Sequence, residues 1–183
     1  KKVQEAMAGN PELQKMANQL LLEMTADGLR IQILDADARP MFSSGSPAVQ
    51  PYMRELLRAV GKLLAEVPNR LTLEGHTDAM PFPGGERGYS NWELSADRAN
   101  ASRRELIAGG LPDDQVLRVQ GLAASNPFDR KDPAAPANRR ISIIVMTREA
   151  EDRVFRTQAP VATEPETAPA APAVVSSPAT SLR

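Results

Sequence analysis

The sequence predicts an α/β (α+β) protein, a two-layer sandwich in which helices pack on a small mixed sheet. Two observations predict this fold class. Segments in which every second residue is apolar alternate along the chain with segments that carry apolar residues at helical spacing. Clusters of glycine and proline separate these segments, as they do between secondary-structure elements. The 183 residues suit one folded domain with shorter appendages.

The N-terminal part is expected to contain one helix and one strand. Leucine and methionine recur at helical spacing over residues 11–24, which predicts an amphipathic helix. Asn10 would cap this helix, and Pro11 would occupy its first position. An Asp-Gly pair ends it, and apolar alternation over residues 29–34 then predicts a strand with one well-buried face.

The central part contains the longest helix that the pattern predicts. Apolar residues recur at helical spacing over residues 49–67, and Ser46-Pro47 supplies an N-cap followed by a proline in the first turn. Residues 70–75 alternate as a second strand. A loop rich in proline and glycine follows at residues 81–88.

A second well-defined helix is expected over residues 91–108. Ser90 and Glu93 have the spacing of a capping box, in which the two residues satisfy each other's backbone N–H groups. The pair Gly109-Gly110 ends the helix. The remaining elements are two strands and a short helix, expected at residues 116–121, 141–145 and 148–155.

These elements divide the chain into three parts. We expect residues 1–26 to form a linker with a helix, residues 27–156 the folded domain, and residues 157–183 a disordered tail. The tail is mostly alanine, proline, threonine, serine and valine and has no amphipathic period, so it has little means of forming a core. We expect the tail to be solvated and without a specific role.

Composition excludes several classes of function. The chain has 22 basic and 23 acidic residues and a formal net charge of -1, so it lacks the basic field of a nucleic-acid-binding protein. With no cysteine and one histidine it offers too few ligands for a zinc-type metal site, and no motif predicts a cofactor. No window has the roughly 18–20 apolar residues of a membrane-spanning helix. Because the chain opens at Lys1 without an initiator methionine, we expect it to be a fragment of a longer protein.

The segment from residue 71 to residue 101 carries the most chemical information. Asp78 lies just after a strand, where open α/β folds place ligand sites. At about 100° per residue, the next helix carries Asn91, Ser95 and Arg98 in one polar strip beside its core face. Asp78 and Arg98 together suit a zwitterion, with the carboxylate facing an ammonium and the guanidinium facing a carboxylate. The alternative is a salt bridge between the two that fastens the loop to the helix.

Catalytic interpretations have less support. His76 lies two residues from Asp78, but no nucleophile motif accompanies it, and a histidine that makes one hydrogen bond is the simpler expectation. Glu74 and Asp78 could in principle act as the paired carboxylates of a hydrolase. Trp92 falls on the core side of its helix, so we expect it to anchor the core and not to stack on a sugar. We therefore expect a binding protein and not an enzyme.

The motifs in this segment resemble those of OmpA-like peptidoglycan-binding domains, over about residues 29–147. They are Gly75-His76-Thr77-Asp78, Asn91-x-x-Leu94-Ser95-x-x-Arg98-Ala99 and Asn138-Arg139-Arg140. The resemblance implies a βαβαβ(β) sandwich that captures the diaminopimelate of the peptidoglycan stem peptide. It implies that Asp78 receives the ammonium of this ligand and Arg98 its carboxylate. The other residues expected at the peptidoglycan site are Thr77, Asn91, Leu94, Ser95 and, as a contact or as support for Asp78, Arg139.

More narrowly, residues 88–99 and the long loop before them resemble the MotB family of flagellar motor stator proteins. This resemblance implies a periplasmic domain that anchors the stator to the cell wall, in a parent protein held in the bacterial inner membrane. The implied partners are peptidoglycan, a second copy of the chain, and MotA through a transmembrane helix outside this sequence. The linker would rearrange when the stator is activated. The alternative is an envelope anchor of the OmpA/Pal type that has no flagellar role.

Overall fold

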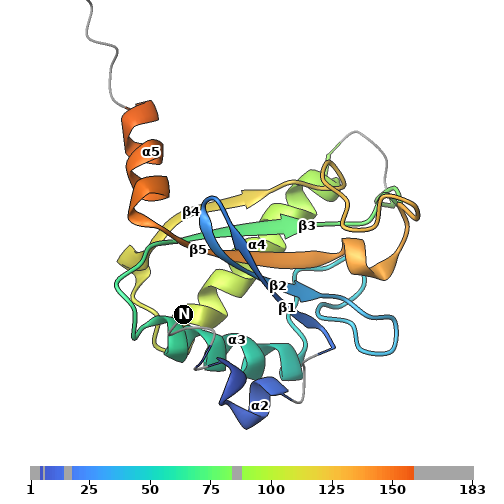
Figure 1. Cartoon of the computed structure of the whole chain (residues 1–183). Helices are drawn as coiled ribbons and strands as arrows, with labels where there is room; N and C mark the ends of the chain where they lie inside the picture. Colours follow the sequence, from blue (N-terminus) through green and yellow to red (C-terminus); the bar gives the residue numbers. More distant parts are fainter. Residues whose placement is uncertain (1–4, 6, 15–17, 84–87, 159–183) are drawn as a thin grey trace, which may run out of the picture.

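The chain forms a five-stranded mixed sheet in a computed structural model that describes residues 5, 7–14, 18–83 and 88–158 (Figure 1). The strand order is β1-β2-β5-β3-β4, and neighbours are antiparallel except β3 and β4, which are parallel. The strands are β1 (Leu20–Thr25), β2 (Gly28–Leu34), β3 (Leu71–His76), β4 (Val116–Gly121) and β5 (Arg140–Met146). The predicted fold class is confirmed.

Helices lie on both faces of this sheet. The two long helices, α3 (Pro51–Leu64) and α4 (Asn91–Ala108), pack on one face, and α5 (Arg148–Gln158) starts from the other (Figure 1). The side chains of β5 pack against helices on both faces of the sheet, because successive strand residues point to opposite faces. Ile143 belongs to the main core with α3, whereas Ile144 packs against α5. β5 is therefore apolar on both faces, and it lies at the centre of the fold.

The N-terminal segment differs from its prediction. The expected helix over residues 11–24 is wrong, because α2 spans only Pro11–Gln14 and Leu20–Thr25 forms the edge strand β1. β1 pairs with β2 as an antiparallel hairpin. Apolar spacing alone does not separate a short helix from a strand, and here the pairing with β2 decides the outcome. The sheet therefore begins before residue 27, where the folded domain was expected to start.

Helix α3 begins later than predicted. Its N-cap is Gln50, whereas the expected cap, Ser46, lies in the preceding loop. Phe42 and Val49 form a β-bridge in that loop, so the chain is extended where the helix was expected to start. This loop forms one wall of the cavity that contains Asp78.

Helix α4 spans the residues predicted for it. The backbone N–H of Ser90 donates to Glu93 Oε2 at 2.8 Å, and the hydroxyl of Ser90 completes the capping box. The predicted strands from β2 to β5 and helix α5 also occupy their expected places to within a few residues. Two 3-10 helices, Asp113–Gln115 and Pro136–Asn138, precede β4 and β5. Residues 159–183 lie outside the described residues, so the disordered tail stays a prediction.

The expected core anchor, Trp92, is 55% exposed, so that prediction is wrong. The reason is the close approach of α4 to the sheet. A Cβ atom at Gly75 would lie 1.9 Å from the backbone oxygen of Ser95, and one at Gly121 would lie 2.4 Å from the backbone nitrogen of Ala96. Small residues are needed where the helix backbone is this close, so the indole remains outside.

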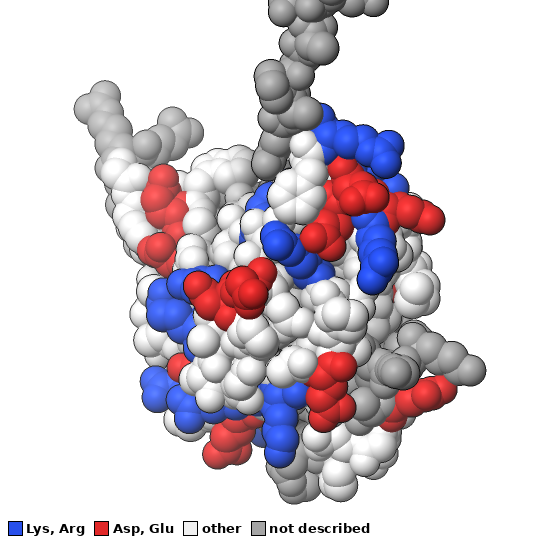
Figure 2. All heavy atoms as spheres, turned by 90° about the vertical axis from the view of Figure 1, so that its left-hand side faces the viewer, with Lys and Arg blue, Asp and Glu red and all other residues white. Residues whose placement is uncertain are grey.

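The surface is mixed in charge. Figure 2 shows basic and acidic side chains interspersed over the face that it presents, which is unlike the single-sign field of a nucleic-acid-binding surface. Across residues 5–158, leaving out those that the structure does not describe, no helix combines the length and the hydrophobicity needed to cross a bilayer.

Candidate functional site

A cavity of about 400 Å3 lies at the carboxyl end of β3, beside the first turns of α4. Three parts of the chain meet there: the loop between β2 and α3, the loop after β3, and the residue that precedes β5. The predicted site residues that line the cavity are Thr77, Asp78, Asn91, Leu94, Arg98 and Arg139. The fold thus gathers six of the seven expected residues around one hollow.

Asp78 is paired with Arg139 and not with Arg98. Its Oδ2 accepts a hydrogen bond from Arg139 Nη1 at 2.9 Å, and its Oδ1 accepts one from the Met80 backbone N–H at 3.1 Å. The side chain of Asp78 keeps 13% of its surface exposed, on the cavity wall. The carboxylate is therefore held in one orientation but can still be reached from the cavity.

Arg139 binds three carboxylates at once. Nε donates to Asp35 at 2.7 Å, Nη1 to Asp78 at 2.9 Å and Nη2 to Asp37 at 3.2 Å. Burial opposes ionisation, but these carboxylates raise the pKa of Arg139 above its usual value. Because all three nitrogens of the guanidinium already have a carboxylate partner, Arg139 acts as a support that orients Asp78.

Arg98 has the opposite environment. It is 8% exposed, and it donates from Nε to the Ser46 carbonyl at 3.1 Å and from Nη2 to the Ser43 carbonyl at 3.4 Å. Its guanidinium carbon lies 5.0 Å from the ring centre of Phe42. Burial lowers the pKa of Arg98, although arginine stays protonated in proteins.

No salt bridge joins Arg98 to a carboxylate among the residues that the structure describes. The alternative reading of the sequence, in which Arg98 and Asp78 fasten the loop to the helix by a salt bridge, is therefore wrong. Neutral carbonyls orient the cation without neutralising it. A buried cation that lines a cavity is suited to bind an anionic ligand, because a ligand carboxylate would supply the missing charge.

Thr77, Asn91 and Leu94 provide smaller contacts. Thr77 is 3% exposed, its backbone N–H donates to the Ala123 carbonyl at 3.0 Å, and its buried hydroxyl has no hydrogen-bond partner among the described residues. Asn91 donates from Nδ2 to the Met80 carbonyl at 2.8 Å. Leu94 adds an apolar wall. The free hydroxyl of Thr77 is a second polar group that a ligand could satisfy.

Ser95 does not line the cavity. Its hydroxyl donates to the Trp92 carbonyl at 2.9 Å and accepts from the Ala123 backbone N–H at 3.0 Å. The Ala123 carbonyl in turn accepts the N–H of Thr77. Ser95 therefore fixes the loop after β4, which then holds Thr77 beside Asp78.

Sequence analysis missed the wall formed by the loop between β2 and α3. Asp35, Phe42 and Ser43 line the cavity from this side. Asp35 accepts the Met41 N–H at 2.7 Å in addition to its contact with Arg139, so it holds the loop in place. The one available signal was the position of Asp35 directly after a strand, the same position that drew attention to Asp78.

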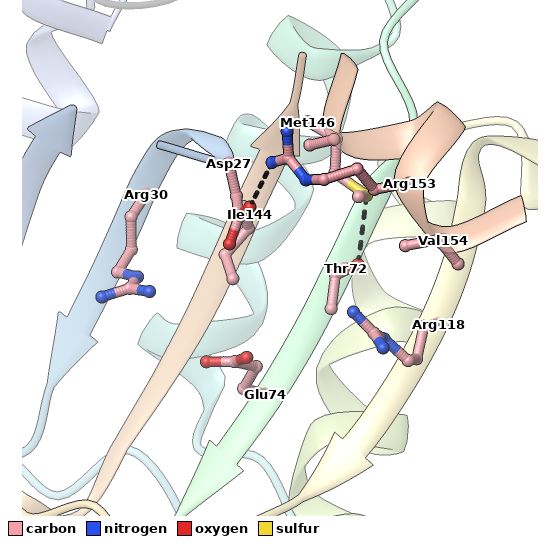
Figure 3. Close-up of a pocket in the computed structure, with 10 residues that line it drawn as sticks. Asp27, Arg30, Thr72, Glu74, Arg118, Ile144, Met146, Arg153 and Val154 are labelled. Carbon is pink, nitrogen blue, oxygen red and sulfur yellow. Dashed lines mark hydrogen bonds and ion pairs between the residues drawn. The ribbon is translucent and has the colours of Figure 1, made fainter. Parts of the chain in front are cut away.

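His76 and Glu74 do not belong to this cavity. Glu74 lines a separate hollow on the opposite face of the sheet (Figure 3), so it is not paired with Asp78 and the hydrolase arrangement is absent. His76 is 2% exposed, and neither ring nitrogen has a hydrogen-bond partner among the described residues; Nε2 is 3.6 Å from Glu74 Oε2. The predicted single hydrogen bond of His76 is therefore wrong. Burial lowers the pKa of His76, and Glu74 only partly offsets this.

Metal ligands are also not gathered. No group of three or more histidine, cysteine, aspartate or glutamate side chains could hold a metal ion within the described ranges. The three carboxylates nearest the cavity converge on the guanidinium of Arg139. The cavity itself presents one buried cation, Arg98, and one accessible carboxylate, Asp78.

The family model described as "OmpA family" matches residues 41–141, which include α4 and, from the loop wall, Phe42 and Ser43. The chain belongs to the OmpA family.

Within this family the chain is similar to flagellar proteins. It is 49% identical over 159 residues to Motility protein B of Escherichia coli (strain K12), an alignment that covers 87% of this chain and 52% of that protein. The chain thus spans about half the length of the curated relatives it matches.

Two solved structures share the OmpA-family fold of this chain. The periplasmic domain of Helicobacter pylori MotB superposes with a TM-score of 0.62 at 21% identity, covering 78% of this chain and 90% of that one. The cell wall anchor of the T6SS from Pseudomonas aeruginosa superposes with a TM-score of 0.63 at 24% identity, covering 79% and 96%. At this level of identity the likeness concerns the fold alone.

Proposed function

We propose that this OmpA-family domain binds peptidoglycan non-covalently by capturing the zwitterionic end of a diaminopimelate side chain. The observation that carries the proposal is the state of Arg98, a buried cation that lines the cavity with no carboxylate bound to it. Asp78 lines the same cavity. The two groups provide opposite charges within one hollow, as an ammonium and a carboxylate on one carbon atom require.

Each residue has a distinct role in this proposal. Arg98 receives the ligand carboxylate, and Asp78 receives the ammonium. Arg139 keeps Asp78 in place, since its own hydrogen bonds are used on three carboxylates. Thr77 contributes its unpaired hydroxyl and Leu94 contacts the aliphatic part of the ligand.

The charge balance supports a ligand without net charge. Among the residues that line the cavity, Asp35 and Asp78 contribute two negative charges and Arg98 and Arg139 two positive ones, so the lining has no net charge. A simple anion would gain from Arg98 but would be repelled by Asp78. A zwitterion satisfies both, so we expect the protein to select for it.

We further propose that this binding anchors a flagellar stator to the cell wall. The proposal rests on the similarity to Motility protein B, which extends over 87% of this chain. In it, the domain lies in the periplasm as a homodimer, and the parent protein is held in the inner membrane beside MotA. Rearrangement of the residues before β1 would accompany stator activation. Holding a wall requires binding and not bond cleavage, so we propose no enzymatic step.

The test of wall binding is co-sedimentation of the chain with purified sacculi that contain diaminopimelate. We expect the wild type to pellet and Arg98→Ala and Asp78→Ala to lose binding by at least tenfold, because each leaves one ligand charge unpaired. Arg104→Ala, an exposed arginine on the same helix, is the matched control and should pellet like the wild type. Circular dichroism checks that each variant is folded. Full binding by both folded site variants would refute the role of the cavity.

The stator role needs a separate test in cells. In Escherichia coli, the corresponding part of Motility protein B is replaced by this domain, and swimming is measured in soft agar. We expect motility with the wild-type domain and its loss with Arg98→Ala. Wall binding in vitro without motility in cells would instead favour an envelope anchor with no flagellar role.

A further inference from the structure

A second cavity, of about 290 Å3, lies on the sheet face opposite α3 and α4, under the first turns of α5 (Figure 3). It shares no lining residue with the cavity that contains Asp78. Ile144 and Met146 of β5 line it together with Ala150 and Val154 of α5. Its volume is at the small end of the range for ligand pockets, which suits a molecule of amino-acid size.

Two arginines stand on opposite sides of this cavity. The strand register puts Arg30, Ile144, Thr72 and Arg118 in one row across β2, β5, β3 and β4. Neighbouring strands are about 4.8 Å apart, so the first and last backbones of the row are separated by about 14 Å. This spacing leaves room for a small ligand between the two guanidinium groups.

These two guanidinium groups have few partners of their own. Arg30 has a buried Nε without a hydrogen-bond partner, and its Nη1 is 3.9 Å from Glu23, a side chain that is 53% exposed. The guanidinium of Arg118, which lines the cavity, has no hydrogen bond or ion pair with the described residues. The third arginine of the cavity, Arg153, is by contrast already paired with Asp27 at 2.8 Å.

One carboxylate lies between Arg30 and Arg118. Figure 3 shows Glu74 on β3, one of the two strands between those that carry Arg30 and Arg118. Its Oε1 accepts a hydrogen bond from the Gln120 side-chain amide at 2.8 Å. Burial opposes ionisation, but the nearby His76, Gln120 and Arg30 lower the pKa of Glu74, so it is negatively charged at neutral pH.

We propose that this cavity binds a small amino acid with two carboxylates, of the glutamate type. Arg30 and Arg118 would each receive one carboxylate, and Glu74 would receive the ammonium. Once the Asp27–Arg153 pair is set aside, the three remaining charges sum to one positive charge, and such a ligand carries one negative charge. The methylene groups of the ligand would contact Ile144 and Val154. The site is independent of wall binding.

Isothermal titration of the whole chain with L-glutamate and with glutarate tests the proposal. Glutarate has both carboxylates but lacks the ammonium. We expect glutamate to bind more tightly, because Glu74 attracts its ammonium and repels a plain dianion. Arg118→Ala should weaken glutamate binding about ten- to hundredfold, the range for one lost charged hydrogen-bond contact. Glu74→Gln should abolish the preference for glutamate over glutarate.

Arg104→Ala, an exposed arginine that lines neither cavity, is the matched control and should leave glutamate binding unchanged. The titrations are repeated in the Arg98→Ala background, because the other cavity is itself proposed to bind an amino-acid zwitterion. Arg118 is exposed, so its replacement should not disturb folding, and circular dichroism verifies this. The proposal is overturned if wild type does not bind glutamate, if glutarate binds as tightly, or if folded Arg118→Ala binds glutamate like the wild type. Because sacculus binding depends on the other cavity, failure here leaves that proposal intact.

Discussion

Replacing the two arginines of the cavity that contains Asp78 should affect different properties of the protein, stability for Arg139 and ligand binding for Arg98. Arg139→Ala removes the centre of a three-carboxylate cluster, whereas Arg98→Ala removes a cation held by two neutral carbonyls. The first change should reduce the free energy of unfolding. The second should mainly reduce binding to peptidoglycan.

The size of each effect follows from burial. Asp35 and Asp78 keep 9% and 13% of their side-chain surface exposed, so Arg139→Ala leaves two nearly buried carboxylates without their cation. Breaking a buried pair costs about 3–5 kcal/mol, and since Arg139 itself is 25% exposed we expect about 2–4 kcal/mol. Asp37 is 81% exposed and should add little. For Arg98→Ala we expect about 1 kcal/mol, because lost carbonyl contacts are offset by relief of the buried charge.

Urea unfolding followed by circular dichroism measures both values, and sacculus co-sedimentation measures binding. Arg139→Lys is an informative control, since a lysine keeps the charge but cannot reach three carboxylates with a planar fork. It should fall between the wild type and Arg139→Ala. If Arg139→Ala were as stable as the wild type, or less harmful than Arg98→Ala, the reasoning about the carboxylate cluster would be refuted.

Three other predictions concern α4 and the buried histidine. Gly121→Ala should destabilise the fold by about 1–3 kcal/mol in thermal or urea unfolding, because its Cβ would lie 2.4 Å from the backbone of Ala96; an unchanged midpoint would contradict this packing. Ser90→Ala should cost about 1 kcal/mol through loss of the capping box, and Ser90→Asp should retain most of the stability. Burial lowers the pKa of His76 in the folded state, so folding excludes a proton that the unfolded chain binds below its ordinary pKa of about 6.5. The free energy of unfolding should therefore be highest above that pH and should fall as the pH is lowered towards 5. In urea titrations, His76→Gln should show a weaker pH dependence over this range.

Local sequence patterns were sufficient to predict much of the fold. The capping box at Ser90 and Glu93 and the glycines after residue 108 defined α4 at both ends. Alternation defined β3 and β5, and motifs along α4 and after β3 pointed to Arg98 and Asp78. Each of these signals lies within a few residues of chain, where spacing along a helix or strand directly sets which side chains share a face.

Contacts across the sheet decided the rest. Leu20–Thr25 became a strand because β2 offered an edge, and Trp92 was left outside because α4 approaches the sheet too closely for a large side chain. The partner of Asp78 proved to be Arg139, 61 positions away, which left Arg98 without a carboxylate partner among the described residues. The sequence by itself determined which charged groups are present and which elements carry them. Only the tertiary structure decided which charges neutralise one another, because ion pairing depends on distances of a few ångströms that strand order and packing set between remote segments.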